Sequence, residues 1–371
     1  MNKTNHKNVI VAMSGGVDSS VAAKLLKDKG FNPTGIFLHF WKDENYSHQE
    51  AEAENKCCSL EALADARRVC QQIGISLYTL NFSNVFKKEV VDYFLNEYKC
   101  GRTPNPCVRC NKSVKLGLLI KRAGKLGFDY VASGHYVRIK KSKLVHKLYK
   151  GRDRDKDQSY FLWTLTQEQL SHLLFPLGDY KKEEVRRLAK KFKLPTASKK
   201  ESQEICFIPS GSHNDFLKKY IKLKSGPIKT LDGKEVGKHQ GLPLYTIGQR
   251  KGVEIGGIGP FYVAKCDYKT NTLYVVDNGE DQILYDDKLI AKKVNWIVGV
   301  EPKLPLACEA VIRYRHKPVK CKIEKLIVKN NREEYLVKFK EPQRAITAGQ
   351  SVVFYNKEEV IGGGIIDLAG N

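Results

Sequence analysis

Residues 9–20 combine an apolar segment, a Ser-Gly-Gly turn and small polar residues, in the order V-I-V-A-M-S-G-G-V-D-S-S. The two glycines allow the backbone to approach a ligand more closely than other residues would. The hydroxyls of Ser14, Ser19 and Ser20, and the first N–H groups of a helix after the turn, can donate to phosphate oxygens. This pattern predicts a phosphate-binding loop, although it contains neither G-x-x-x-x-G-K-[ST] nor G-x-G-x-x-G.

A second group of chemically active residue types occurs in G-R-T-P-N-P-C-V-R-C-N-K, at residues 101–112. The two prolines predict a stiff, non-helical approach to the C-x-x-C pair. We expect Arg102, Arg109 and Lys112 to favour the thiolate form through their positive charge. A C-x-x-C is also typical of half a zinc site or of a redox pair, and the sequence has no second C-x-x-C to complete four zinc ligands. A further cysteine, Cys206, follows a polar segment.

The composition indicates a basic globular protein. The 371 residues include 64 Lys and Arg against 41 Asp and Glu, for a formal net charge of +23, and 42% are hydrophobic. This length fits two or three domains, and the charge favours a polyanionic partner such as RNA, DNA or an anionic membrane. Residues 181–200 contain nine Lys or Arg, which predicts an RNA contact or a solvated helix face.

The sequence contains no apolar run near the ~18 residues of a membrane span, and its first eight residues are polar. We therefore expect a cytoplasmic protein with no membrane partner. Its ten cysteines are then expected to be reactive, metal-binding or buried, because disulfide scaffolds are rare in that compartment.

The elements that must position these residues alternate between strand and helix. Strands are predicted over residues 9–13, 34–40, 75–80 and 129–133, and helices over residues 19–29, 60–74 and 84–98. This alternation predicts the α/β class, with a doubly wound parallel sheet whose ligands bind at the carboxyl ends of the strands. The Ser-Gly-Gly turn, Gly134 and His135 would all lie at that edge.

The pattern of residue types along the sequence changes after about residue 210. Glycine turns and short segments dominate to about residue 285, and short alternating segments separated by turns follow to the end. We therefore expect an α/β domain over residues 1–209, a small central α+β domain over 210–285, and a C-terminal β-barrel over 286–371.

The loop S-G-G-x-D-S resembles the pyrophosphate loop of the ATP pyrophosphatases. Nearly the whole chain resembles the tRNA-specific 2-thiouridylases of the MnmA family. The motifs that carry this resemblance are A-M-S-G-G-V-D-S at 12–19, G-R-T-P-N-P at 101–106, C-N-K at 110–112, S-G-H-Y at 133–136, G-R-D-R-D-K-D-Q-S-Y-F-L at 151–162, S-Q-E-I-C-F-I-P at 202–209, G-Q-R-K-G at 248–252 and R-Y-R at 313–315.

The resemblance implies a role for each matching position. It implies that ATP binds at Ala12, Met13, Ser14, Gly15, Gly16, Val17, Asp18 and Ser19, with Leu38 and Gly134 beside the nucleotide. It implies that Cys110 is the nucleophilic cysteine and that Cys206 carries a persulfide. It implies that Asn105, Pro106 and Cys107 meet the target uridine, and that tRNA contacts His135, Lys156, Asp157, Gln158, Arg313, Tyr314 and Gln350.

The reaction implied by the resemblance is the ATP-dependent 2-thiolation of a wobble uridine in tRNAs of the Lys, Glu and Gln type. Transfer of AMP to the C2 oxygen would release pyrophosphate, and persulfide sulfur would then replace the adenylated oxygen. A Cys110–Cys206 disulfide would remain. Mg²⁺ would neutralise the ATP phosphates, Asp18 would orient Mg²⁺ or cap the loop, and a cysteine desulfurase or a sulfur-relay protein would supply the sulfur.

The chain departs from the family pattern at Cys107, where many members have Asp. Cys107 is therefore an auxiliary or resolving thiol, or one of three ligands, with Cys110 and Cys206, of an iron–sulfur cluster. We rank this cluster behind the persulfide route. The residues alone leave two other function classes open: a different adenylating synthetase, which would not need the two cysteines, and an RNA-binding protein without ATP turnover.

Overall fold

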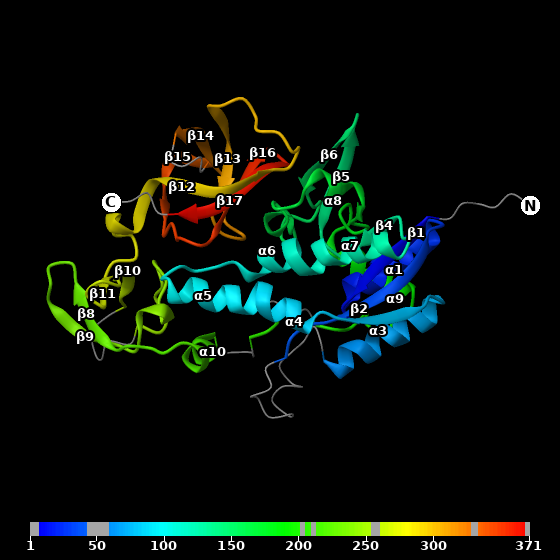
Figure 1. The fold of residues 1–371 in the computed structure, drawn as a ribbon, viewed down its shortest axis with the longest axis horizontal. Coiled ribbons are helices and arrows are strands. Elements are labelled where there is room, and N and C mark those ends of the chain that lie inside the picture. The colour runs from blue at the N-terminus through cyan, green and yellow to red at the C-terminus, as the bar shows by residue number, and fades with distance from the viewer. Residues whose placement is uncertain are drawn as a thin grey trace, which may run out of the picture.

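A computed structural model describes residues 7–42, 59–200, 205–208, 213–253, 260–327 and 333–367. Figure 1 shows three bodies: an α/β domain near the N-terminus, a small β domain at the opposite end of the long axis, and a C-terminal barrel on one side of both. Each helix in these ranges is too short or too polar to cross a membrane.

The first domain is built on a parallel sheet with the strand order β3-β2-β1-β4-β7. Its strands are β1 (Asn8–Met13), β2 (Asn32–His39), β3 (Leu77–Asn81), β4 (Tyr130–Ala132) and β7 (Leu173–Leu174). Side chains alternate along a strand, so β1 directs Val9, Val11 and Met13 into one core and Ile10 and Ala12 into the other. Both faces are therefore buried, and the predicted doubly wound sheet is confirmed.

Helices cover both faces of this sheet. One face is covered by α1 (Val17–Asp28), α3 (Leu60–Ile73) and α9 (Lys182–Lys191). The other face is covered by α4 (Ser83–Phe86), α5 (Tyr93–Lys99), α6 (Pro106–Cys110), α7 (Gly117–Lys125) and α8 (Gln167–Ser171). Two π-helical segments, Lys87–Asp92 and Asn111–Lys115, connect these helices. The first of them falls inside the helix that we predicted over residues 84–98.

The central domain contains one helix and a four-stranded sheet with the order β10-β11-β8-β9. Its elements are α10 (His213–Tyr220), β8 (Gly226–Thr230), β9 (Glu235–His239), β10 (Tyr262–Asp267) and β11 (Thr272–Val276). Ile228, Val263, Leu273 and Val275 are buried together at its centre, so this domain has its own small core.

The C-terminal domain is a closed barrel of six strands. They are β12 (Tyr285–Trp296), β13 (Leu306–Val311), β14 (Val319–Ile327), β15 (Glu333–Arg344), β16 (Ser351–Asn356) and β17 (Glu359–Asp367). Strand β12 pairs with β15 on one side and with β17 on the other, which closes the barrel. The prediction of a C-terminal β-barrel is confirmed.

A hairpin of the first domain extends the barrel sheet. It consists of β5 (Val137–Ser142) and β6 (Val145–Lys150), and β6 pairs with β17 through Tyr149–Glu359 and Leu148–Val360. Leu148 and Val360 are fully buried at this seam. Two domains thus share one sheet, which the sequence analysis did not predict.

The seam predicts a matched pair of stability effects. Leu148→Ala removes a side chain with no exposed surface and should lower the free energy of unfolding by about 2–5 kcal/mol. Leu144→Ala, in the turn of the same hairpin, removes a side chain that is 92% exposed and should have little effect. Thermal unfolding of both variants checks this, and equal transition temperatures would contradict it.

Candidate active site

The phosphate loop lies between β1 and α1 and requires glycine at its centre. Gly15 has a φ of +67°, in the left-handed region, and a Cβ built on it would overlap the carbonyl oxygen of Ala62 in α3. Gly16 is the N-cap residue and α1 begins at Val17. The N–H groups of the first turn of α1 therefore lie at the loop, where an α-helix leaves them without intrahelical partners.

Hydroxyl groups hold the loop from within. The Ser14 N–H donates to Ser19 Oγ at 3.2 Å, and Ser19 Oγ donates to the Gly16 carbonyl at 3.1 Å. Ser20 is fully buried, donates to the same carbonyl at 2.8 Å and accepts from Thr196 Oγ1 at 3.1 Å. The expectation that Ser20 faces a phosphate is wrong, because its hydroxyl braces the loop and lies outside the cavity wall.

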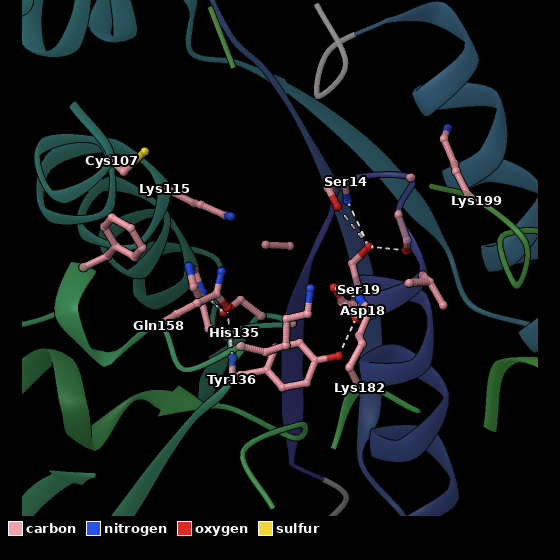
Figure 2. Close-up of a pocket in the computed structure, with 18 of the residues that line it drawn as sticks. Ser14, Asp18, Ser19, Cys107, Lys115, His135, Tyr136, Gln158, Lys182 and Lys199 are labelled. Carbon is pink, nitrogen blue, oxygen red and sulfur yellow. Dashed lines mark hydrogen bonds and ion pairs between the residues drawn. The ribbon is translucent and has the colours of Figure 1, made fainter. Parts of the chain in front are cut away.

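The loop forms one wall of a cavity of about 470 Å³. The predicted site residues that line it are Ala12, Ser14, Gly15, Gly16, Val17, Asp18, Ser19, Cys107, Gly134, His135, Lys156, Gln158 and Tyr314. Figure 2 shows Ser14, Asp18 and Ser19 on one side, and Cys107 and Lys115 on the other. The structure thus brings the phosphate loop and several predicted tRNA-contacting residues onto the same cavity.

Other predicted site residues do not line this cavity. Met13 and Leu38 are buried in strands β1 and β2. Asn105 is the N-cap of α6 and accepts from the Val108 N–H at 3.2 Å, while Pro106 is buried in the first turn of that helix. These two residues start the helix that carries Cys107 and Cys110.

Two predicted tRNA contacts, Asp157 and Gln350, form internal hydrogen bonds in this structure. Asp157 accepts from the Gly151 N–H at 2.9 Å and from Ser159 Oγ at 2.7 Å, and burial raises the pKa of its carboxyl. Gln350 Nε2 donates to the Thr103 carbonyl at 2.9 Å, which connects the barrel to the segment before α6. Arg313 and Gln350 line a neighbouring cavity of about 350 Å³.

The two predicted catalytic thiols are not among the residues that line the cavity. Cys107 is exposed and lines the cavity, whereas Cys110, one helical turn later, and Cys206 are half-buried and pack against the same apolar core. The structure forms no disulfide between Cys110 and Cys206, the pair that the resemblance implies. Among the residues that the structure describes, no three His, Cys, Asp or Glu side chains are placed to hold a metal ion, and the cluster hypothesis has no support.

Two of the three positive charges that the sequence places beside the C-x-x-C pair have carboxylate partners. Arg102 donates to both carboxylate oxygens of Glu97 at 2.6 Å, and Arg109 forms an ion pair with Glu89. Each guanidinium thus has a carboxylate partner, which offsets part of the positive charge that the sequence places beside the C-x-x-C pair.

Positive charge is instead concentrated on the cavity wall. Five basic residues of this wall were assigned neither to ATP nor to tRNA in the sequence analysis: Lys115, Lys182, Lys199, Lys200 and Arg315. Three of them belong to the basic cluster over residues 181–200, which we had interpreted as an RNA contact or a solvated face. Lys182 lies three residues before Val185 and seven before Ala189, so it shares the buried face of α9 with them. This spacing is visible in the sequence, but it does not show whether a lysine on that face is buried.

His135 contributes a neutral ring to the cavity. Its Nδ1 is 2.7 Å from Ser133 Oγ, and both side chains are buried. Burial, with a smaller contribution from the positive charge of Lys115, holds its pKa well below the usual value. The imidazole is therefore uncharged at neutral pH, and it can serve as a hydrogen-bonding group but not as a cation.

Comparisons with family profiles cover all three domains. Residues 7–210 match the profile "tRNA methyl transferase HUP domain", residues 214–277 match "tRNA methyl transferase PRC-barrel domain", and residues 286–366 match "Aminomethyltransferase beta-barrel domain". Among solved structures, an NMN synthetase from Francisella tularensis is similar with a TM-score of 0.33 and 19% identity, over 57% of this chain and 71% of that chain.

Curated relatives match over nearly the full length. The chain is 46% identical over 367 residues to a protein from Thermoanaerobacter sp. named tRNA-specific 2-thiouridylase MnmA 2, covering 98% of each chain. It is 45% identical over 369 residues to tRNA-specific 2-thiouridylase MnmA of Geobacillus thermodenitrificans, covering 99% of this chain and 96% of the relative. With these matches along its whole length, the chain belongs to the tRNA-specific 2-thiouridylase (MnmA) family.

Proposed function

We propose that this chain is a sulfurtransferase that converts the wobble uridine of tRNA to 2-thiouridine at the expense of ATP, with AMP and pyrophosphate as products. The observation that carries the proposal is the single cavity lined by the phosphate loop and by Cys107, Lys156, Gln158 and Tyr314. A reaction between ATP and a base of RNA requires both substrates to meet in one such space.

The nucleotide would bind with its phosphates at the loop. Hydroxyls, the N–H groups at the start of α1 and the lysines of the wall supply donors and positive charge for a triphosphate. Mg²⁺ would enter with ATP as part of the substrate. Among the described residues of the cavity wall, Asp18 is the carboxylate that could orient it. Gly134 fits this arrangement, because a Cβ there would lie 2.9 Å from the Ser19 nitrogen and hold the two segments apart.

The chemistry would proceed in two stages. The C2 oxygen of the uridine attacks the α-phosphorus of ATP and pyrophosphate leaves, which converts a poor leaving group into AMP. Persulfide sulfur on Cys206 then forms a bond to C2, AMP leaves with the oxygen, and the Cys110 thiolate attacks Cys206 sulfur to give a disulfide that a reductant later cleaves. This route requires movement, since Cys110 and Cys206 are half-buried here and are not joined by a disulfide.

The same proposal includes the partners of the chain and the role of each domain. The tRNA would be of the wobble-uridine Lys, Glu or Gln type, and a cysteine desulfurase or a relay protein in the cytoplasm would deliver the sulfur. Chemistry would take place in residues 1–209, with residues 210–285 and the barrel of 286–371 helping to hold tRNA. The formal net charge of +23 supports a polyanionic substrate.

The two thiols give the first test of this proposal. Unmodified tRNA is incubated with ATP, Mg²⁺, a desulfurase and cysteine, and the wobble nucleosides are analysed by mass spectrometry. The wild type should form 2-thiouridine, and Cys110→Ala and Cys206→Ala should fall to the level of a reaction without enzyme, because each removes a sulfur that the transfer needs. Cys100→Ala, which removes an exposed free thiol, should remain active.

Other outcomes separate the alternatives. ATP consumption without 2-thiouridine would favour a different adenylating enzyme, and RNA binding without ATP turnover would favour a binding protein. Full activity of both cysteine variants would reject the persulfide route.

The phosphate loop gives the second test. Gly15→Ala forces a side chain into the left-handed region and against the Ala62 carbonyl, so the loop must shift. We expect ATP to bind at least about tenfold more weakly, a loss of ~1.4 kcal/mol or more. Gly124→Ala in α7 has nothing within 4 Å of the added Cβ and should bind ATP as the wild type does. Titration calorimetry compares the two, and equal affinities would contradict this reading of the loop.

A further inference from the structure

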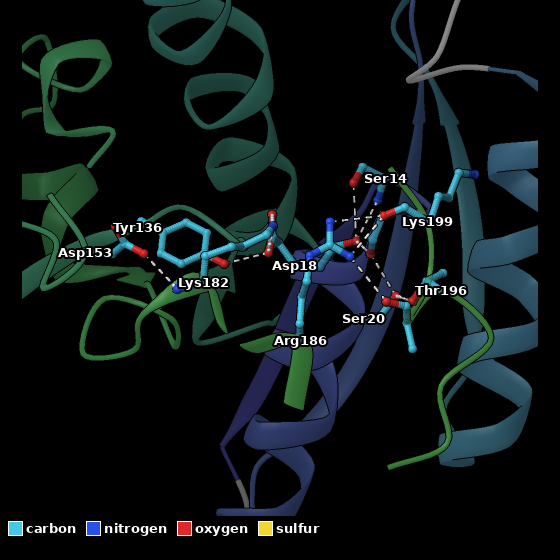
Figure 3. A network of polar contacts seen from close by, with 12 residues as sticks. Ser14, Asp18, Ser20, Tyr136, Asp153, Lys182, Arg186, Thr196 and Lys199 are labelled. Atoms are coloured by element: carbon cyan, nitrogen blue, oxygen red, sulfur yellow. Dashed lines mark hydrogen bonds and ion pairs between the residues drawn. The ribbon is translucent and has the colours of Figure 1, made fainter. Parts of the chain in front are cut away.

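Lys182 is a buried cation directly beside the phosphate loop. Its Nζ donates to Oδ1 and Oδ2 of Asp18 at 2.7 and 2.8 Å, and the residue is 8% exposed. The Tyr136 hydroxyl donates to the same Asp18 Oδ1 at 2.7 Å, and Lys182 Nζ lies 5.6 Å from the centre of the Tyr136 ring. Figure 3 shows Lys182 extending along this ring toward Asp18.

Helix packing alone does not require this ion pair. The first helix α1 and α9 already share an apolar contact region that includes Val21, Val185 and Ala189, all fully buried. Removing the Lys182 ammonium from water is costly, and its attraction to the partly exposed Asp18 carboxylate only partly offsets that cost. An ion pair with a buried lysine and a carboxylate that stays 31% exposed at the edge of a cavity is therefore better explained by a ligand than by stability.

The position of the pair points to an anionic ligand. Asp18 is in the first turn of α1, among the residues whose N–H groups face the loop, and both Asp18 and Lys182 line the cavity. The Lys182 N–H donates to Asp153 Oδ2 at 2.8 Å, which fixes the start of α9 beside the loop. An ammonium group at this point can reach a phosphate bound at the helix N-terminus.

Other lysines of the wall are engaged elsewhere or lie across the cavity. Lys199 forms ion pairs with Asp65 and Glu61, both on α3. Lys115 comes from the opposite side of the cavity, as Figure 2 shows. Of these three, Lys182 is the lysine whose carboxylate partner belongs to the loop itself.

We propose that Asp18 holds Lys182 in the nucleotide-free protein, and that Lys182 transfers its hydrogen bonds to the pyrophosphate portion of ATP when the nucleotide binds. This inference rests on the proposed use of ATP. The phosphate oxygens and the Asp18 carboxylate compete for one ammonium group, while the Tyr136 hydroxyl continues to donate to Asp18. Asp18 thus holds the ammonium group beside the loop before the substrate arrives, and the phosphate must displace this carboxylate when it binds.

The test measures the affinity for inorganic pyrophosphate by titration calorimetry, in a buffer with a chelator so that no divalent cation contributes. Lys182→Gln should weaken binding about tenfold or more, because a charged donor is lost. Asp18→Asn should strengthen binding, because the competing carboxylate is gone. Lys190→Gln makes the same change of charge at an exposed position of α9 and should bind as the wild type does.

The double variant Asp18→Asn/Lys182→Gln is the decisive control. It has the net charge of the wild type and leaves no buried charge without a partner, so it is expected to fold even where a single variant does not. It should bind pyrophosphate as weakly as Lys182→Gln. Thermal unfolding of each variant confirms that the compared proteins are folded.

Three results would overturn the exchange: no pyrophosphate binding by the wild type, wild-type affinity in the double variant, or a loss in Asp18→Asn as large as that in Lys182→Gln. The last result would mean that the ion pair is a fixed support of the loop. Failure of the proposed function has a different signature, since the wild type would then bind pyrophosphate but form no 2-thiouridine.

Discussion

The site depends on close approach between backbone segments at two glycines. Gly15 lies so near the Ala62 carbonyl that a side chain would overlap it, and Gly134 lies against the peptide that joins Asp18 to Ser19. These contacts allow the loop, the first turn of α3 and the turn after β4 to converge on one point. The cavity, the exposed N–H groups of α1 and the position of the lysines all follow from this convergence.

The positive residues of the chain fall into two groups, those away from the cavity and those that line it. Arg102 and Arg109 pair with glutamates and do not line the cavity, whereas Lys115, Lys182 and Lys199 line it, the last two with carboxylate partners of their own. Net charge attracts an RNA molecule over a distance of about a Debye length. The positions of the charges inside the cavity instead determine which ligand binds there, and they favour a polyphosphate.

Much of the fold was predictable because its signals are local. An apolar strand followed by Ser-Gly-Gly and a helix defines the loop, and the alternation of strands and helices defines the parallel sheet. Pairing between distant segments gives no such signal. The contact of β6 with β17, and the binding of Lys182 to Asp18, join residues far apart in the chain, so neither can be read from spacing.

The site was predictable in its chemistry but less so in its geometry. Residue types identified the loop and the cysteines, but they could not show that Ser20 braces the loop or that Asn105 caps a helix. Hydroxyl and amide side chains can serve a ligand or the backbone equally well. Only the positions of neighbouring donors and acceptors distinguish the two uses.

The shared sheet between the first domain and the barrel limits how this protein can be divided. If the chain were cut before β12, β6 would keep β5 but lose its pairing with β17, and Leu148 would lie on an open strand edge. Such an edge is a template for pairing with other chains, so the isolated nucleotide domain would tend to aggregate. The barrel therefore also protects the β6 edge of the first domain from pairing with other chains. Another domain could replace it only if that domain supplied a strand that pairs with β6 in the same register.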